Sequence, residues 1–262
     1  MKILFFGDVV GRVGRQAVKH FLPKLVEKYQ VDFVIANGEN VTHGKGLIEK
    51  HYNELIDNGV DCITLGNHYM SKDTIMDYID DATALVRPLN LSKRIGGSGS
   101  VVFEVNGVKI RVTNILGTAF MKEEVSSPYY SFKQLLDSLG DEDSIHIVDY
   151  HGEATSEKIC FGYAFDGLVS AVIGTHTHVQ TNDAHILDNG TGFICDAGMC
   201  GAYGGVLGFE KHSVMNKTLY GDKSRFEIDE NALPMVNCVV IDVDELTKKC
   251  REIFPVSLVE KK

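Results

Sequence analysis

Residues able to bind metal ions follow five apolar segments of this sequence, at the points where those segments end. They are acids, amides and imidazoles: Asp8, Glu39, Asn40, Asn67, His68, His151, His176 and His178. Ligand sites in sheets of parallel strands lie beyond the carboxyl ends of the strands, so side chains from these distant segments would meet at one rim. Their joint occurrence at five strand ends predicts a metal centre. Mixed carboxylate, amide and imidazole ligation suits Fe, Mn or Zn.

Each of these residues also has an ordinary structural explanation when it is taken alone. An Asp directly after a strand is usually a turn residue or a helix N-cap. The pair His176 and His178 differs, because side chains two positions apart on a strand point to the same face. His43, in a glycine-flanked loop, is left open as a contact to a substrate. Other histidines are expected at the surface or in satisfied core positions: His20 and His51 in helices, His146 and His185 in strands.

The number of candidate ligands bears on how many ions the centre holds. With His68 left aside, seven candidates remain, too many for one four-coordinate zinc with an open position. They suit two ions that share a bridging carboxylate. Two ions about 3.5–4 Å apart can generate hydroxide at neutral pH and stabilise both the attacking and the leaving oxygen of a phosphoryl displacement.

The first third of the chain repeats a strand–loop–helix pattern three times, which predicts parallel strands in a sheet covered by helices. The apolar runs lie at 2–6, 32–36 and 61–65, and helical spacing follows at 18–29, at 48–56 and from Ser71. Pro23 predicts a kink or a split in the first of these helices. Gly59 is placed to end the second.

The later part of the chain has a mixed pattern. Two Asn-Gly pairs, Asn106-Gly107 and Asn189-Gly190, predict β-hairpins. Further strands are expected at 100–105, 108–113, 144–150, 168–173, 184–187, 192–195, 235–243 and 254–259, and a further helix at 156–165. No Pro- or Ser-rich linker and no obvious repeat interrupts the sequence, so residues 1–262 are expected to form a single α/β domain.

Composition limits the classes of protein and of partner. The 262 residues include 26 Lys and Arg against 36 Asp and Glu, and the formal net charge of −10 argues against an extensive nucleic-acid surface. A small anionic substrate is compatible with this charge if metal ions make the site locally positive. No stretch approaches the roughly 20 apolar residues that span a bilayer, and the first residues turn acidic too soon for a signal peptide. A soluble cytoplasmic protein without a membrane partner is expected.

The six cysteines form no C-x-x-C pair, so reduced structural thiols are expected rather than disulfides or thiolate zinc. Four lie in apolar contexts: Cys62, Cys160, Cys195 and Cys238. A free thiol in such a context behaves as a small hydrophobe.

Together, the motifs resemble those of a known superfamily. The segments Gly7-Asp8, Gly38-Glu39-Asn40, Gly66-Asn67-His68, His151 and Thr175-His176-Thr177-His178, in this order, resemble the calcineurin-like metallophosphoesterases. More narrowly, nearly the whole chain is similar to the bacterial branch described as 2′,3′-cyclic-nucleotide 2′-phosphodiesterases, including residues 7–11 and 151–155. The resemblance implies a four-layer α-β-β-α sandwich with two mixed sheets.

The chain also departs from the superfamily pattern at three positions. Val10 stands where the superfamily usually has a histidine ligand, Glu39 replaces the usual bridging Asp, and Tyr69 replaces an acid. These departures are themselves similar to the narrow branch, in which the amide next to the bridging Glu takes up a ligand position.

The resemblance implies a role for each site residue. One ion would be held by Asp8, Glu39, Asn40 and His178, and the other by Glu39, Asn67, His151 and His176. A bridging hydroxide would attack phosphorus in line, and His68 would protonate the leaving oxygen. The implied reaction is hydrolysis of small phosphodiesters, 2′,3′-cyclic nucleotides above all, with Fe or Mn favoured over Zn.

Two other functions are weighed against this hypothesis. One is a regulatory protein that binds a nucleotide or RNA and hydrolyses little, since slow hydrolysis with tight binding would look the same in sequence. The other is a metal-dependent amidohydrolase, whose His-x-His pair belongs to the first strand, whereas here the pair follows a late one. The metals, the preferred nucleotide and the oligomeric state, a homo-oligomer included, are left open.

Overall fold

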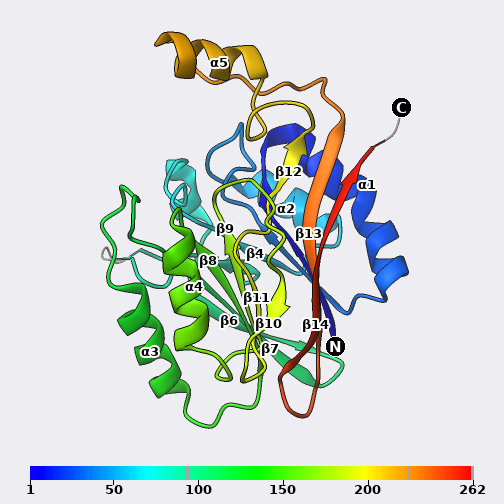
Figure 1. The fold of residues 1–262 in the computed structure, drawn as a ribbon, viewed down its shortest axis with the longest axis vertical. Coiled ribbons are helices and arrows are strands. Elements are labelled where there is room, and N and C mark those ends of the chain that lie inside the picture. Colours follow the sequence, from blue (N-terminus) through cyan, green and yellow to red (C-terminus); the bar gives the residue numbers. More distant parts are fainter. Residues whose placement is uncertain (92–94, 224, 261–262) are drawn as a thin grey trace.

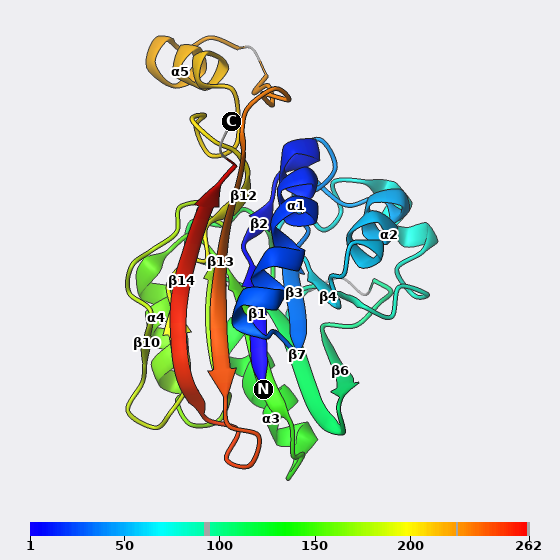
Figure 2. The same ribbon diagram turned by 90° about the vertical axis from the view of Figure 1, so that its right-hand side faces the viewer.

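The computed structural model describes residues 1–91, 95–223 and 225–260. Within them, two mixed β-sheets lie face to face, and helices cover the outer face of each sheet (Figures 1 and 2). The layers are therefore α-β-β-α, and the predicted α/β sandwich is confirmed.

The first sheet holds the strands from both the beginning and the end of the sequence. Its strands are β1 (Lys2–Phe6), β2 (Asp8–Val9), β3 (Phe33–Asn37), β4 (Cys62–Thr64), β5 (Leu85–Val86), β12 (Met199–Ala202), β13 (Pro234–Val243) and β14 (Cys250–Val259). Their order is β2-β12-β13-β1-β3-β4-β5, and β14 pairs with β13. The strands β1, β3 and β4 are parallel, as predicted, and the unpredicted β5 continues this parallel arrangement, whereas β13 is antiparallel to β1. Just beyond β1, the Gly7 N–H donates to the Asn237 carbonyl of β13 at 3.1 Å.

The second sheet has a parallel centre and antiparallel edges. Its strands are β6 (Ser100–Val105), β7 (Val108–Leu116), β8 (Ile145–His151), β9 (Ala171–Thr175), β10 (His185–Ile186) and β11 (Gly192–Ile194), in the order β10-β11-β9-β8-β7-β6. Both predicted hairpins are confirmed, because β6 pairs antiparallel with β7 and β10 pairs antiparallel with β11. Asn106 and Gly107 both have positive φ, which is the backbone geometry that a two-residue hairpin turn requires.

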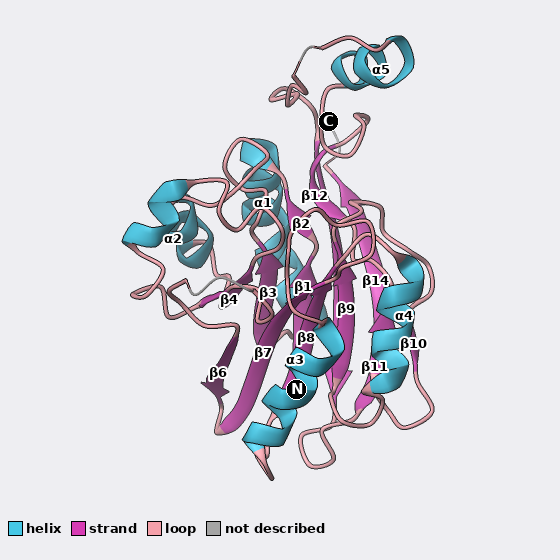
Figure 3. Cartoon of the chain, turned by 90° about the vertical axis from the view of Figure 1, so that its left-hand side faces the viewer, coloured by secondary structure: helices cyan, strands magenta, loops and turns pink. Residues whose placement is uncertain are grey.

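Helices α1 (Gly11–Tyr29) and α2 (Glu49–Asp57) cover the first sheet, and α3 (Pro128–Leu139) and α4 (Thr155–Ala164) cover the second (Figures 2 and 3). Helix α5 (Lys211–Tyr220) extends from one end of the sandwich (Figure 1). The prediction of a split at Pro23 is wrong, because α1 is one continuous helix. Proline cannot donate a helical hydrogen bond, which costs free energy. The free energy gained by packing the apolar face of the helix, including Phe21, Leu22 and Leu25, is larger.

Two further expectations are corrected. The helix expected from Ser71 is only a short 3-10 helix over Asp73–Asp77, in which Ile75 is the buried residue. Cys160 is exposed on α4, although its neighbours in the sequence are apolar, whereas the other five cysteines are buried. All six are free thiols, as predicted. In the described part of the chain, every helix is too short or too polar to span a membrane.

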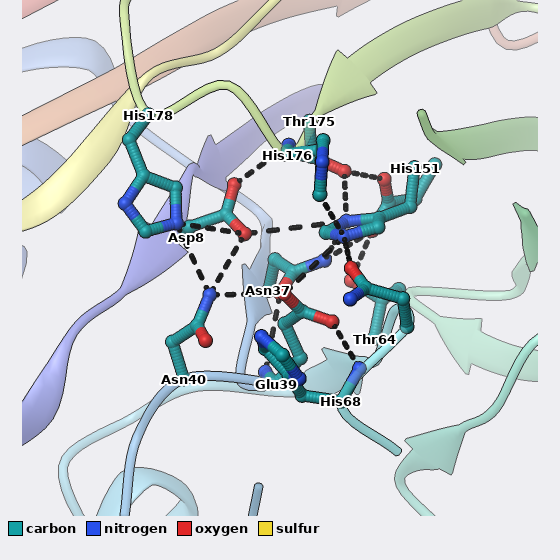
Figure 4. A network of polar contacts seen from close by, with 12 residues as sticks. Asp8, Asn37, Glu39, Asn40, Thr64, His68, His151, Thr175, His176 and His178 are labelled. Atoms are coloured by element: carbon teal, nitrogen blue, oxygen red, sulfur yellow. Dashed lines mark hydrogen bonds and ion pairs between the residues drawn. The ribbon is translucent and has the colours of Figure 1, made fainter. Parts of the chain in front are cut away.

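Alternating side chains of the strands fill three apolar layers. Ile3 and Phe5 of β1 face the second sheet, whereas Leu4 and Phe6 pack with residues of α1 and α2. Strand β8 alternates in the same way between the first sheet and the helices α3 and α4. The apolar side chains of the strands fill these layers. The polar residues at the carboxyl ends of β1, β3, β4, β8 and β9 lie beyond the layers, at one rim of the sandwich (Figure 4).

Two histidines occupy satisfied core positions, as predicted. His146 on β8 is buried, and its Nε2 lies 2.8 Å from Thr113 Oγ1. Burial lowers the pKa of His146 to about 3, so it is held neutral in the folded protein. His51 on α2 lies 2.8 Å from Thr42 Oγ1 through its Nδ1, and burial lowers its pKa to about 4.

Candidate metal centre

All the predicted site residues lie at one rim of the sandwich, where strands of both sheets end (Figure 4). Asp8 follows β1, Glu39 and Asn40 follow β3, and His151 is the last residue of β8. The loop after β4 supplies Asn67 and His68, and the loop after β9 supplies His176 and His178. Asp8, Glu39, Asn40 and His151 are at most 3% exposed, so this is an interior site rather than a surface patch.

One group of ligand-type atoms surrounds the side-chain amide of Asn40. The Asn40 Nδ2 atom lies 3.4 Å from Asp8 Oδ1, 2.9 Å from Glu39 Oε1 and 3.1 Å from His178 Nε2. A single amide nitrogen thus faces three atoms that can accept hydrogen bonds. The oxygen and nitrogen of an Asn side chain exchange places when the amide turns over, so the same side chain can present its oxygen to this space.

A second group surrounds the His151 imidazole. The His151 Nε2 atom lies 3.2 Å from Glu39 Oε1, 3.0 Å from Asn67 Oδ1 and 3.1 Å from His176 Nδ1. The Glu39 Oε1 atom therefore belongs to both groups. Ligand atoms of Glu39, His151 and His176 all lie within 4.8 Å of one another, which makes this trio a group that could hold a metal ion.

Outer partners orient the three imidazoles of the site. His176 Nε2 lies 3.1 Å from Glu153 Oε2, and His178 Nδ1 lies 3.0 Å from the Leu207 carbonyl. Both partners accept hydrogen bonds, so they place the ring proton on the outward nitrogen and leave an unprotonated nitrogen facing inward. Such acceptor contacts are typical of metal-binding histidines. The inward-facing nitrogens and carboxylates together form a donor set that fits a divalent cation.

The third imidazole, His151, is oriented by a buried network. Its Nδ1 lies 2.9 Å from Thr175 Oγ1, and that hydroxyl donates to Asp149 Oδ1 at 2.6 Å. Asp149 also accepts from Thr64 at 2.5 Å and from Asn37 at 3.0 Å. Burial raises the pKa of Asp149 to about 6. Sequence reasoning missed Asp149 because it lies inside an apolar run, although its position two residues before His151 places it on the same face of β8.

The pKa values of the two buried carboxyl groups, Asp8 and Glu39, depend on burial and on the positive charge of nearby histidines. Burial raises the pKa of Asp8. Burial also works to raise the pKa of Glu39, but the charge and hydrogen bond of His151 prevail and lower that pKa to about 2. Against its own burial, the same contact with Glu39 raises the pKa of His151 to about 9. A proton on His151 therefore balances the carboxylates without a metal, and a bound cation would replace that proton.

The backbone next to the centre is shaped to leave room for it. A Cβ atom built on Gly66 would collide with Glu39 Oε2 and His151 Nε2. Only glycine allows the chain to pass this close to the ligand atoms. The sequence contains this glycine in the segment Gly66-Asn67-His68, where the resemblance marked it as part of a motif.

His68 lies beside the two groups of ligand atoms. Its backbone N–H donates to Glu39 Oε2 at 2.9 Å, and its Nδ1 lies 3.3 Å from Ser71 Oγ. The imidazole lines a cavity of about 310 Å³ that opens over Glu39, Asn40, His176 and His178. His43 does not line this cavity but an adjoining groove. His68 is therefore placed to reach a molecule bound over the centre.

Comparison with known proteins extends over nearly the whole chain. The sequence profile of the YmdB-like proteins matches residues 4–256. The chain belongs to the YmdB-like family. A 2′,3′-cyclic-nucleotide 2′-phosphodiesterase of Bacillus subtilis is 44% identical over 253 residues, which cover 97% of this chain and 95% of that protein. The predicted resemblance is thus confirmed.

Solved structures of similar proteins have the same fold. A structure described as a novel phosphatase, from Mycoplasma pneumoniae, superposes with a TM-score of 0.92 at 42% identity, covering 99% of this chain and 93% of that one. A hypothetical protein from Thermus thermophilus superposes with a TM-score of 0.91 at 34% identity, and both chains are covered completely. The names of the relatives confirm the predicted enzyme class of this family, phosphodiesterase or phosphatase.

Proposed function

We propose that the chain is a phosphodiesterase that uses two divalent metal ions to hydrolyse small phosphodiesters, 2′,3′-cyclic nucleotides above all, with residues 1–262 acting as one domain. One observation carries the proposal: Glu39 Oε1 belongs to both groups of ligand atoms, at 2.9 Å from Asn40 Nδ2 and 3.2 Å from His151 Nε2. The 44% identity to a 2′,3′-cyclic-nucleotide 2′-phosphodiesterase supports the substrate class.

The ligand sets follow the two groups of atoms around the shared carboxylate. One ion would be held by Asp8, Glu39, Asn40 and His178, and the other by Glu39, Asn67, His151 and His176. Oxygen and imidazole ligands without thiolates favour Fe or Mn, with Zn as the alternative. Two such ions explain how a chain of net charge −10 binds a phosphate.

The reaction requires positioning and a proton donor. Bound divalent ions polarise the phosphate and lower the pKa of a water nucleophile. The chain itself fixes the imidazole ligands through Glu153, Thr175 and Leu207, so the donor set does not have to reorganise during the reaction. His68, in the wall of the cavity, protonates the ribose oxygen that leaves, a role that imidazole serves well near neutral pH.

Metal removal and replacement test this function directly. The purified protein is stripped with EDTA, then reconstituted with Mn²⁺ or Fe²⁺ under anaerobic conditions, and hydrolysis of adenosine 2′,3′-cyclic phosphate is followed. We expect two ions per chain and turnover only after reconstitution. Full turnover by the stripped protein would overturn the metal role. Micromolar nucleotide binding with negligible product would instead support a regulatory binding protein.

A further inference from the structure

A second concave surface adjoins the cavity over the candidate metal centre. It has a volume of about 600 Å³, and its walls include four basic and two aromatic side chains: Lys45, Lys72, Lys217, Arg225, Phe209 and Phe226. We call it the basic groove. Lys45, Phe209 and Phe226 also line the cavity over the metal centre, so the two spaces adjoin and share part of their walls. The basic groove is therefore the nearest positively charged surface for a second group of a molecule bound at the centre.

The charge of the basic groove is opposite to that of the whole chain. The described residues that line it include no Asp or Glu, whereas the chain as a whole carries a net charge of −10. Positive side chains gathered in a concave surface create a local potential that attracts anions. Lys and Arg are also the side chains that bind phosphate groups through charge-assisted hydrogen bonds.

The aromatic pair lies where the two spaces meet. The ring centroids of Phe209 and Phe226 are 5.5 Å apart, with the ring planes inclined at 46°. The Lys217 ammonium lies 4.8 Å from the centroid of the Phe226 ring, so α5 brings a cation against the aromatic side chain. Aromatic rings beside basic groups are the usual means of holding a base and its phosphate without reading the sequence.

The loop that carries Lys45 is tied to the metal centre by backbone hydrogen bonds. Gly46 N–H donates to the Glu39 carbonyl at 2.5 Å, and Thr42 N–H donates to the Gly46 carbonyl at 2.9 Å. Lys72 lies against this loop, since a Cβ on Gly46 would come within 2.7 Å of Lys72 Cγ. The side of the basic groove formed by Lys45 and Lys72 is thus held close to Glu39.

We propose that the basic groove binds a second phosphate of the substrate, attached to the 5′ oxygen of the nucleoside whose cyclic phosphate lies at the metal centre. This inference rests on the proposed function and specifies its substrate class, a 5′-phosphorylated nucleoside 2′,3′-cyclic phosphate. In the reaction, one P–O bond of the cyclic diester breaks, water supplies the hydroxyl group to phosphorus, and the leaving ribose oxygen takes the proton. The second phosphate serves only to bind.

The first test measures binding and does not depend on turnover. Calorimetry compares adenosine 3′,5′-bisphosphate with adenosine 3′-monophosphate on the Mn²⁺-loaded protein. We expect the bisphosphate to bind roughly tenfold tighter, the effect of one charge-assisted contact. Equal affinity would overturn the inference, whether or not the protein hydrolyses cyclic nucleotides. Absence of hydrolysis with tenfold tighter binding would overturn only the proposed function.

The second test measures turnover and identifies the source of the second phosphate. It compares kcat/KM for adenosine 2′,3′-cyclic phosphate, for the same nucleotide with a 5′-phosphate, and for the dinucleotide ApA ending in a 2′,3′-cyclic phosphate. Preference for both larger substrates supports a phosphate within RNA, and preference for the 5′-phosphorylated mononucleotide alone supports a free nucleotide. Equal kcat/KM for all three would overturn the inference.

Paired variants connect the preference to the basic groove. Lys72→Ala combined with Arg225→Ala should abolish most of the roughly tenfold preference for a 5′-phosphate. The control combines Lys19→Ala in α1 with Lys109→Ala in β7, which removes the same charge from exposed positions outside the groove. The control should keep the preference. A preference that survives in the groove variant would place the second phosphate elsewhere and overturn the proposal.

Discussion

Asp149 and His151 lie two residues apart on β8 and are joined through the hydroxyl of Thr175. That hydroxyl lies 2.9 Å from His151 Nδ1 and donates to Asp149 Oδ1 at 2.6 Å. The chain of contacts fixes the ring of His151 and leaves its Nε2 facing Glu39 and Asn67. A buried carboxylate thus acts on the candidate metal centre without touching it.

Removing the connecting hydroxyl should weaken metal binding. Thr175→Val is expected to lower metal affinity about 10- to 100-fold, the usual effect of losing an outer partner of a metal-binding histidine. Competition with a metal-sensitive dye measures the affinity. Thr113→Val is the matched control, since Thr113 is another buried strand threonine bonded to a histidine, His146. Equal affinities in the two variants would exclude Thr175 from positioning His151.

His68 should be needed for turnover but not for metal binding. His68→Ala is expected to keep two ions per chain and to lower kcat about 10²- to 10⁴-fold, because the leaving oxygen loses its proton donor. Metal analysis and the hydrolysis rate are measured on the same sample. His185→Ala, at an exposed position on β10, serves as control and should change neither quantity. Unchanged kcat in His68→Ala would remove His68 from the mechanism.

A single methyl group at position 66 should block the centre. Gly66→Ala is expected to reduce bound metal well below two ions per chain, because the new Cβ collides with Glu39 Oε2 and His151 Nε2. In Gly201→Ala the added Cβ has ordinary contacts of 3.4 Å or more, so this control should bind metal normally. Full metal content in Gly66→Ala would show that the ligands lie elsewhere.

Metal binding should release a proton and strengthen as the pH rises. The pKa of His151 is about 9 in the metal-free site, so the ring is protonated at neutral pH and must lose its proton before Nε2 can bind an ion. Affinity should therefore rise by up to tenfold per pH unit until about pH 9. Calorimetry in buffers of different ionisation enthalpy counts the protons. Metal binding without any proton release would contradict the His151 assignment.

Acid should destabilise the fold through His146. Its pKa is about 3 in the folded state and about 6.5 when unfolded, so the unfolded state binds more protons between these values and stability falls as the pH drops below 6.5. The contribution of His146 to this loss is about 2 kcal/mol at pH 5, to which His51 adds a loss of the same sign. Urea denaturation of the metal-free protein at pH 7 and pH 5 measures it. His146→Gln should show a smaller loss, and the exposed control His185→Gln should behave like the unaltered protein.

Much of the fold and the grouping of the site residues were predictable because both depend on apolar strands. A buried parallel strand has a continuous apolar run, and the first polar residue after it marks the rim, as Asp8 and His151 do. The short strands β2 and β5 have two residues each, too few for any periodic pattern. Helix α5 was not predicted because Val214 is its only buried residue among those described, so it has no apolar stripe.

The rest of the site could not be read from the sequence for a different reason. Asp149 is polar within an apolar run, and only the neighbouring strands reveal that Thr64 and Thr175 satisfy it. Lys45 and Lys217 both line the basic groove, although they are far apart in the sequence. They come together only because of the position of α5 in the folded chain. Side chains brought together from separate loops leave no periodic signal.

The pairing of β1 with β13 bears on when this protein becomes active during its synthesis. Asp8 begins β2, which pairs with β12, and directly follows β1, which pairs with β13. The ribosome makes both partner strands much later, because β12 begins at Met199 and β13 at Pro234. Until those residues emerge, one edge of β1 is open and Asp8 has no buried surroundings. The nascent chain therefore carries Asp8 long before its partner strands exist, and a metal ion held as proposed would bind only after β12 and β13 have formed.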